Sequence, residues 1–342
     1  MTHKTFFMFI APSLLAMMLF IALPIVSVVT QSLHVEHEKV LIEVENCGPF
    51  GCQKETRVDT EATAKLIEEQ PFGQFNGLGT YTNRAHLAFD ELGAAWRSSQ
   101  SVGSFISEIM NLPFYRALIF TLTYTFVVTP LVIILGFLIA ISVNMVAKWI
   151  KGPVIFFSLL PMMVTPLVGS LILFWMVDAR GVLGASIQTL FNDPDLSLKA
   201  SPTLTWIMLF VYGVWSSAPF AFVIYYAGLQ TVPQDTVESA MVDGASRWER
   251  VRYVVIPHLL PLTTFVALIQ LMDNFKVFEP VVGFNAEASA TTLSSIIYQD
   301  LRGEQQLFSS AAATSVLTII GVGILLSPVF IRTWRDFNRK SH

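Results

Sequence analysis

Polar and ionisable residues interrupt an otherwise apolar run near residue 270. They are Gln270, Asp273, Asn274, Lys276 and Glu279. Amide, carboxylate and ammonium groups can hydrogen-bond a hydroxylated solute or relay an ion, and a charged group in hydrocarbon costs at least ~2.5 kcal/mol unless it faces protein or water. The pattern therefore predicts a polar pathway through a membrane. Asp273 and Lys276 can also neutralise each other, because they stand three residues apart on a helix.

The preceding apolar run carries a comparable set. Small residues, a helix breaker and aromatics occur together as Gly213, Trp215, Ser217, Pro219 and Phe220. Pro219 leaves a backbone carbonyl without its helical partner, which is tolerated where the backbone lines a cavity. Aromatic faces beside amide and carboxylate groups suit a polyol, so we expect this set to line the same pathway. Packing is the alternative for Phe220 and Trp215.

A charged stretch, residues 233–257, separates the two runs. Asp235 and Glu238 have the spacing of a capping box that opens a helix, and Pro257 is expected to end it. Apolar and small residues recur at helical spacing as Val237, Ala240, Met241, Gly244, Trp248 and Val251. We therefore expect a short amphipathic helix. Three roles are open for this helix. It rests in the lipid interface, it is an ordinary connector, or it docks into a groove on a partner, where Gly244 would allow the two backbones to approach closely.

The composition shows what these elements are embedded in. The 342 residues are 53% hydrophobic and only 13% charged, about half the charge of a soluble domain. Six long apolar runs, each able to cross a hydrocarbon layer of ~30 Å, cover Phe6–Val29, Ala117–Ala147, Pro153–Val177, Pro202–Thr231, His258–Pro280 and Phe308–Ile331. We predict an all-α polytopic membrane protein with six transmembrane helices. The first run is expected to be a retained helix rather than a signal peptide.

Basic residues predict the orientation of these helices. With the N-terminus inside, the inner segments hold more Lys and Arg than the short outer loops, including Arg247, Arg250 and Arg252 of the charged stretch. Both termini and residues 233–257 are therefore expected in the cytoplasm. The polar segment 32–112 is then external.

The external segment contains two strand-like runs, KVLIEVE and QKETRV, around the turn NCGPFGC. We expect a β-hairpin there. Cys47 and Cys52 are the only cysteines and form a candidate disulfide in an oxidising compartment, with two free thiols as the alternative.

The external segment also contains a cluster of histidines and glutamates and two stretches rich in small polar residues. The cluster His34, Glu36, His37 and Glu38 permits a metal site, but we favour a solvated collar above the membrane. The stretches NGLGTYTN and WRSSQSVGS are expected to form turns and a flexible connection. No catalytic arrangement occurs in the segment.

The charged stretch closely resembles a known signature. Glu238-Ser239-Ala240, three residues, Gly244, nine residues and Val254-Val255-Ile256-Pro257 match the EAA signature of ABC importer permeases, which runs Glu-Ala-Ala, three residues, Gly, nine residues, Ile-x-Leu-Pro. In that family the segment is a coupling helix seated in a cleft of an ATPase. The resemblance implies ATPase-coupling roles for Glu238, Ser239, Ala240, Asp243, Gly244, Trp248 and Pro257.

The resemblance extends over about residues 111–335. Trp215-Ser-Ser-Ala-Pro219, Thr292-Leu293-Ser294 and Phe308-Ser-Ser-Ala-Ala-Ala313 are similar to the maltose-type first permease of the carbohydrate-uptake class, although Val282-Gly-Phe-Asn285 departs from that class's usual Thr-Gly-Gly-Gly-Pro turn. It implies sugar contacts at Gly213, Ser217, Phe220, Gln270, Asp273 and Asn274, with Lys276 beside them. No GxxxxGK[ST] loop occurs, so ATP and Mg are expected on a partner ATPase and no cofactor on this chain.

Together these features predict a transport subunit, not an enzyme, in a bacterial inner membrane. The expected organisation is a first transmembrane helix (1–31), an external insert (32–112) and a permease core (113–342). The resemblance implies a second permease, two ATPase subunits and an external solute-binding protein as partners, and we expect no nucleic-acid partner. The alternatives are an ABC permease for a polyol phosphate or polyamine, and an ion-coupled secondary transporter that uses Asp273, Lys276 and Glu279.

Overall fold

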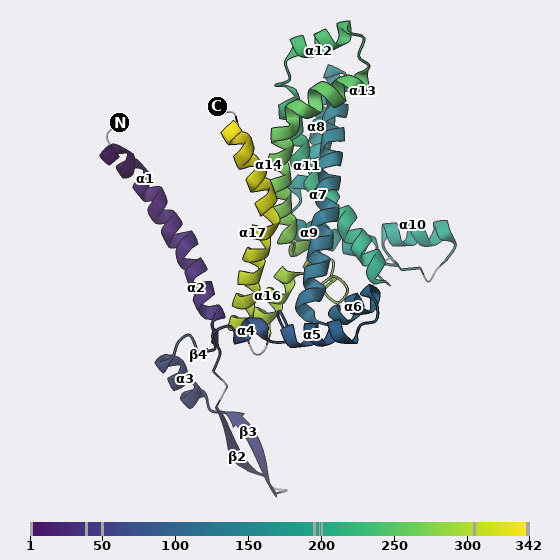
Figure 1. Ribbon diagram of the computed structural model, residues 1–342. Coiled ribbons are helices and arrows are strands. Elements are labelled where there is room, and N and C mark those ends of the chain that lie inside the picture. The colour runs from purple at the N-terminus through teal and green to yellow at the C-terminus, as the bar shows by residue number, and fades with distance from the viewer. Residues whose placement is uncertain are drawn as a thin grey trace. The chain divides into compact units, whose positions relative to one another are not determined.

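The computed structural model describes residues 3–37, 40–48, 51–193, 196–197, 199, 201–303 and 306–339 (Figure 1). The chain divides into two compact units. The first comprises Met1–Tyr115 and Ile296–Ile319, and the second comprises Arg116–Ser295 and Ile320–His342.

Long apolar helices dominate the chain. Five helical stretches are long and apolar enough to cross a membrane: Phe6–Ser32, Pro113–Met145 (α7), Pro202–Leu229 (α11), Arg247–Phe275 and Phe308–Arg332, the last within α17 (Phe308–Arg339). A sixth candidate consists of two helices, α8 (Lys148–Met163) and α9 (Pro166–Met176), bent by 93° at the break between them. The predicted polytopic helical fold is confirmed, with five or six spans among the described residues.

The first unit begins with a helix that is apolar on every side. It runs through α1 (His3–Met17), a π-helical turn η1 (Met18–Ala22) and α2 (Leu23–Ser32). After it, β1 (His34–Val35) pairs with β4 (Gln74–Phe75), and β2 (Leu41–Gly48) pairs antiparallel with β3 (Gly51–Val58). The predicted hairpin is therefore present. Its register sets Cys47 opposite Cys52, but the side chains of both cysteines lie outside the described part, so the disulfide stays a prediction.

Helices follow the hairpin where turns and a flexible connection were expected. They are α3 (Thr60–Glu69), α4 (Gly79–Thr82), α5 (Phe89–Ser98) and α6 (Val102–Ile109). WRSSQSVGS is thus mostly helical, and that expectation was wrong. The reason is local capping: Ser101 accepts a hydrogen bond of 3.3 Å from the Ser104 amide and its own amide donates to the Ser104 hydroxyl at 3.1 Å, so the serines start α6.

The histidines and the acid of the candidate metal cluster have separate partners. His34 Nδ1 lies 2.7 Å from the Thr30 carbonyl, and His37 Nε2 lies 3.0 Å from the Gln70 carbonyl. The Glu36 carboxylate accepts a hydrogen bond from the Ser309 amide at the start of α17. Glu38 lies outside the described residues. In the described part of the chain, no group of three or more metal-ligating side chains comes together.

A second histidine of this unit, His86, is fully buried. Its Nδ1 lies 2.9 Å from the Asn83 side-chain oxygen, and its Nε2 lies 3.1 Å from both the Ser310 carbonyl and the Thr314 hydroxyl. Burial lowers the pKa of His86 below its ordinary value. Burial raises the pKa of the nearby Asp300, which accepts a hydrogen bond of 2.6 Å from the Ser310 hydroxyl. Both shifts favour the neutral form.

The core of the second unit lies where α7 crosses α11. Aromatic rings fill this contact: Phe120 and Trp206 have centroids 4.8 Å apart, and Tyr124 and Phe210 have centroids 5.8 Å apart. Each helix is apolar over its length because both lipid and protein surround it. α14 (Ile256–Phe275) packs against α11 from another side and completes the frame that positions the polar residues.

Two of the predicted spans differ from the structure. The third is broken at Val164 and Thr165, which are extended, because Thr165 precedes Pro166 and a residue before proline avoids the helical conformation. The fifth begins at Arg247 instead of near His258 and ends at Phe275. Short α15 (Glu279–Gly283) and α16 (Leu293–Arg302) lie between it and α17.

Candidate functional site

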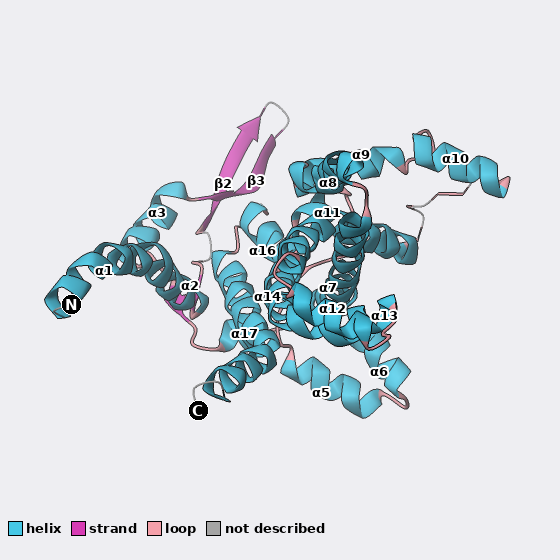
Figure 2. Cartoon of the chain, turned by 90° about the horizontal axis from the view of Figure 1, so that it is seen from above, coloured by secondary structure: helices cyan, strands magenta, loops and turns pink. Residues whose placement is uncertain are grey.

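The segment predicted to couple to a partner forms two short helices joined at a sharp turn. α12 covers Gln234–Val242 and α13 covers Arg247–Arg250. Figure 1 shows both at one end of α11 and α14. Seen from that end in Figure 2, α12 and α13 lie across the helix ends. The single amphipathic helix expected from the sequence is therefore a helix–turn–helix.

Gly244 makes the turn between the two helices. Its φ is +82°, a value that L side chains rarely adopt. The Gly244 amide donates to the Met241 carbonyl at 3.0 Å, and the Ala245 amide donates to the Ala240 carbonyl at 2.9 Å. These two bonds form a Schellman motif, which closes α12 and reverses the chain. The conformation of the backbone thus favours glycine here, independently of any partner.

The caps of these helices differ from the prediction. Pro233, not Asp235, occupies the N-cap of α12, and no side chain caps it. The capping box lies at the start of α13 instead, where the Ser246 hydroxyl accepts from the Glu249 amide at 3.3 Å and the Glu249 carboxylate accepts from the Ser246 amide at 2.7 Å. The pattern Ser-x-x-Glu at residues 246–249 is the sequence signature of this capping box, but it was not used in the prediction.

Pro257 does not end the segment. A π-helical turn, η2 (Val251–Val255), joins α13 to α14, and the Ile256 amide bonds to the Val251 carbonyl five residues back. The wider turn accommodates the proline, which has no N–H and would clash with the carbonyl four residues earlier in an α-helix. Pro257 instead sits in the first turn of α14. α13 thereby continues through the π-helical turn into α14, and Arg247–Phe275 forms one candidate span.

The surface of this segment is partly apolar and open. Val242 is 88% exposed, and Met241 and Trp248 are also exposed, while Glu238, Ser239 and Asp243 surround them with polar groups. Ala240 is half-buried. Such a mixed patch on a projecting turn is typical of a surface that a partner covers.

The positions predicted for the substrate pathway divide into two helices with different surroundings. On α11, Gly213 is buried, and a Cβ placed there would lie 2.2 Å from the Tyr124 hydroxyl. Ser217 and Phe220, on the same face, are half-buried. Gly213 therefore serves the packing of α7 against α11, whereas Ser217 and Phe220 keep some accessible surface.

On α14 the amides are buried. Gln270 and Asn274 are only 4% and 5% exposed. The Asn274 amide donates a hydrogen bond of 2.9 Å to the Thr129 hydroxyl on α7. The Gln270 Oε1 has no hydrogen-bond partner within the described part of the protein. An unsatisfied buried carbonyl costs about 1–3 kcal/mol, so this atom suits a ligand or a water.

Asp273 and Lys276 face outward from the same helix end. Their charged atoms are 3.5 Å apart, and each side chain is about half exposed. They form the internal pair that their spacing allowed. The Ser294 hydroxyl also donates to the Lys276 carbonyl at 3.2 Å, which ties α16 to the end of α14.

The break in the third span is held by groups that the sequence reasoning did not identify. The Tyr212 hydroxyl of α11 donates to the Pro166 carbonyl at 2.9 Å, and the Ser170 hydroxyl lies 3.4 Å from the Glu279 carbonyl of α15. α9 and α15 pack closely against each other. Irregular backbone at membrane depth is tolerated where protein satisfies it or where it lines a cavity. Two interrupted helices thus meet in this unit.

A row of buried threonines on α7 was also missed. Thr121, Thr125 and Thr129 are spaced four residues apart and face the interior. The Thr121 hydroxyl accepts from the Leu293 amide at 3.3 Å, and Thr129 binds Asn274. The spacing of four in an apolar run was a readable signal for one polar helix face.

The cavities beside these helices are apolar. One of about 240 Å³ lies between α9 and α11 and is lined by residues such as Ile172, Met208 and Tyr212. Another of about 540 Å³ lies between α7 and α11, lined by residues such as Leu131 and Phe210. Neither offers the polar groups that a hydroxylated solute needs, so these surfaces suit lipid or a partner helix.

Comparison with known proteins was made on sequence and on fold. Residues 100–335 match the family described as binding-protein-dependent transport system inner membrane component. The chain is similar to a probable ABC transporter permease, y4oQ, of Sinorhizobium fredii (31% identity; 70% of this chain and 77% of that protein). It is also similar to the maltodextrin transport system permease protein MdxF of Bacillus subtilis (31% identity; 62% of this chain and 53% of that protein).

A further relative is the sn-glycerol-3-phosphate transport system permease protein UgpA of Yersinia pestis (25% identity; 66% of this chain and 78% of that protein). Among solved structures, a bacterial ABC transporter involved in the import of the acidic polysaccharide alginate shares the fold, with a TM-score of 0.60 at 19% identity over 81% of this chain and 93% of that one. The chain spans about half the length of the maltodextrin permease but more than three quarters of y4oQ and UgpA.

Proposed function

Because the chain belongs to the family of binding-protein-dependent transport system inner membrane components, we propose that it is the permease subunit through which an ABC importer moves a carbohydrate or sugar derivative. The observation that carries the proposal is the turn from α12 through Gly244 to α13. It projects from the ends of the membrane helices, exposes apolar side chains, and continues without interruption into α14. A force applied there would reach Gln270, Asp273 and Asn274 along the continuous helical stretch Arg247–Phe275.

This geometry supports the coupling roles that we propose. A separate ATPase contacts the surface formed by Glu238, Ser239, Ala240, Asp243, Gly244 and Trp248. Pro257 lies in the first turn of α14, directly after the π-helical turn. The chain has no phosphate-binding loop of its own, so ATP and Mg belong to that partner. The excess of basic residues at this end of the helices supports its placement in the cytoplasm.

Carbohydrate is the cargo that the described polar groups suit best. The unpartnered amide oxygen of Gln270, the hydroxyl of Ser217 and the ring of Phe220 match a polyol with hydroxyls and C–H faces. A polyol phosphate would need cationic groups for its anionic head, but Lys276 is engaged by Asp273. A polyamine would need several free carboxylates. The maltodextrin and alginate systems support the sugar assignment, and the glycerol phosphate relative makes polyol phosphate the second candidate.

The assembly follows the family. A second permease completes the pathway, two ATPase subunits bind the coupling segments, and an external solute-binding protein delivers cargo. Closure of the ATPase pair moves α12 and α13, and α14 carries this motion to the interrupted helices α9 and α15. We place the hinge of the pathway at those breaks, where the Tyr212 hydroxyl donates to the Pro166 carbonyl and the Ser170 hydroxyl lies 3.4 Å from the Glu279 carbonyl.

Uptake into proteoliposomes tests the proposal. The chain is reconstituted with its second permease, its ATPase and the binding protein, and labelled maltodextrins, glycerol phosphate and spermidine are offered with ATP inside. We expect ATP-dependent uptake of the maltodextrins or another sugar that survives an ionophore. Uptake of glycerol phosphate alone would favour the second candidate. Uptake that needs no ATP but collapses with the ion gradient would contradict the proposal and favour a secondary transporter.

A further inference from the structure

α10 (Val182–Phe191) is a short helix that the transport mechanism does not use. It follows α9 after a tight turn, and both views show it standing away from the other helices of the second unit (Figures 1 and 2). At ten residues it is about 15 Å long, half of what a membrane span requires.

The surface of α10 is apolar. The helix contains no charged residue, and Val182, Leu190 and Phe191 are largely exposed, Leu190 at 79%. Its hydroxyl groups bond within the helix: Ser186 donates to the Val182 carbonyl at 2.6 Å, and Thr189 donates to the Ala185 carbonyl at 2.8 Å. The exposed face therefore offers a protein partner few polar groups for specific recognition.

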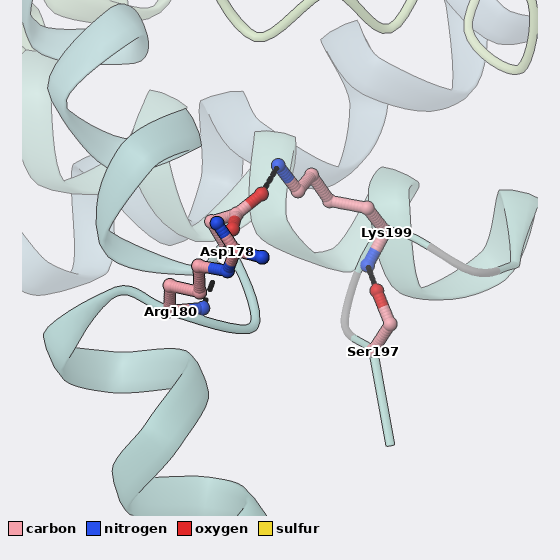
Figure 3. Close-up of polar contacts among 4 residues, drawn as sticks. All are labelled: Asp178, Arg180, Ser197 and Lys199. Carbon is pink, nitrogen blue, oxygen red and sulfur yellow. Dashed lines mark hydrogen bonds and ion pairs between the residues drawn. The ribbon is translucent and has the colours of Figure 1, made fainter. Parts of the chain in front are cut away.

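The position of α10 along the membrane is fixed by its two ends. α9 ends at Met176, and glycines allow α10 to pack onto that end: a Cβ on Gly184 would lie 1.9 Å from the Asp178 carbonyl. On the return path, the Lys199 ammonium lies 2.7 Å from the Asp178 carboxylate, three residues before α11 begins at Pro202 (Figure 3). The same ammonium stands 3.5 Å from the centroid of the Phe174 ring. Both ends are thus tied to the point where two spans leave the membrane.

We propose that α10 lies in the plane of the membrane and inserts its apolar face into the outer leaflet. The occupant of its surface is lipid, because α10 is uncharged and exposes apolar side chains, and the preceding α9 also exposes apolar side chains, including Trp175 near its end. Charged groups flank the helix where lipid headgroups lie: Asp178, Arg180 and Lys199 at the foot of the segment (Figure 3). In this position α10 would attach the outer end of α9 and α11 to the surrounding lipid.

Collision accessibility of nitroxide labels tests this directly. Leu190→Cys and Phe191→Cys are made in a Cys47→Ser, Cys52→Ser background, labelled, and reconstituted in the full complex in phosphatidylethanolamine–phosphatidylglycerol liposomes. Phe126→Cys on the exposed side of α7 is the lipid control, and Glu68→Cys on α3 is the water control. We expect oxygen to collide with labels 190 and 191 several-fold more often, relative to a water-soluble nickel complex, than with label 68.

Two results would overturn the proposal. Labels 190 and 191 that resemble label 68 would place α10 in water. Labels shielded from both reagents would place it against protein, either the second permease or the binding protein. Val182→Cys provides the same reading if a variant at 190 or 191 fails to insert. The measurement needs no transported solute, so its outcome is independent of the proposed cargo.

Discussion

The side-chain amide of Asn274 donates a 2.9 Å hydrogen bond to the hydroxyl of Thr129, and both groups are buried between α14 and α7. One turn earlier on α14, the carbonyl oxygen of Gln270 is buried without a partner among the described residues. Two side-chain amides on one helix face thus differ in their hydrogen bonding. The first is engaged in holding two helices together, and the second leaves its oxygen without a partner among the described residues.

This difference predicts opposite effects of two matched substitutions. Asn274→Leu should lower the free energy of unfolding by about 1 kcal/mol, because it leaves the Thr129 hydroxyl unpaired. Gln270→Leu should leave the melting temperature unchanged or raised, because it removes an unsatisfied group, and should reduce uptake. Melting in detergent and uptake in liposomes are measured on both variants. A loss of stability in Gln270→Leu with unchanged uptake would assign Gln270 to packing.

The pair Asp273 and Lys276 should contribute little to stability. A half-exposed ion pair contributes about 0–1 kcal/mol, so Asp273→Asn and Lys276→Gln are expected to melt within a few degrees of the parent. We expect Asp273→Asn to reduce uptake, since we propose that its carboxylate lines the pathway. The exchanged variant, Asp273→Lys with Lys276→Asp, separates the roles. Full recovery of uptake in the exchanged variant would show that only the pairing matters.

Gly244 allows its two roles to be separated. At a φ of +82°, a residue with a branched Cβ costs roughly 1–2 kcal/mol, whereas Asn tolerates this conformation. Within this chain, a Cβ at Gly244 meets no described atom within 4 Å. Gly244→Val should therefore abolish most uptake while membrane insertion persists, and Gly244→Asn should retain much of it. If Gly244→Asn were as defective as Gly244→Val, close approach to the partner, not backbone conformation, would be the requirement.

The stability of the first unit should depend on pH through His86. Burial lowers its pKa from the ordinary 6.5, so the folded state prefers the neutral ring and loses stability as the pH falls below about 6.5. Asp300 has the opposite effect. Burial raises its pKa, and the negative charge of Glu36 raises it further, so the folded state loses stability as the pH rises through the pKa of Asp300. His86→Gln should flatten the fall in melting temperature between pH 7 and 5.5, and Asp300→Asn should not. An unchanged pH profile in His86→Gln would contradict this.

Features determined by composition and spacing could be predicted from the sequence. The apolar runs gave the helices, and alternating residues around Gly and Pro gave the β2–β3 hairpin. The distance from Glu238 to Gly244 and on to Pro257 pointed to the family, and of these three positions Gly244 is the one at which the chain turns between two helices. The family that the spacing resembles is the family to which the chain belongs.

Where a helix ends or continues at a proline could not be predicted from the sequence, because the outcome depends on the neighbouring backbone and on distant side chains. Pro257 looked like a helix end, but a π-helical turn before it accommodates the ring and lets the helix continue. The run Pro153–Val177 looked like one continuous span, yet the chain breaks at Val164 and Thr165 before Pro166, where the Tyr212 hydroxyl donates to the Pro166 carbonyl. The role of Tyr212 could not be read from one run alone, since it lies 46 residues away.

Cross-linking from the exposed tip of α12 tests the central claim most directly. The photoreactive amino acid benzoylphenylalanine replaces Val242, which is 88% exposed, and, as controls, Trp96 in α5 and Phe126 in α7. The assembled complex is irradiated in native membranes with and without ATP. We predict that position 242 cross-links to the ATPase subunit and that positions 96 and 126 do not. Cross-links from position 242 to lipid alone, or from position 96 to the ATPase, would contradict the account.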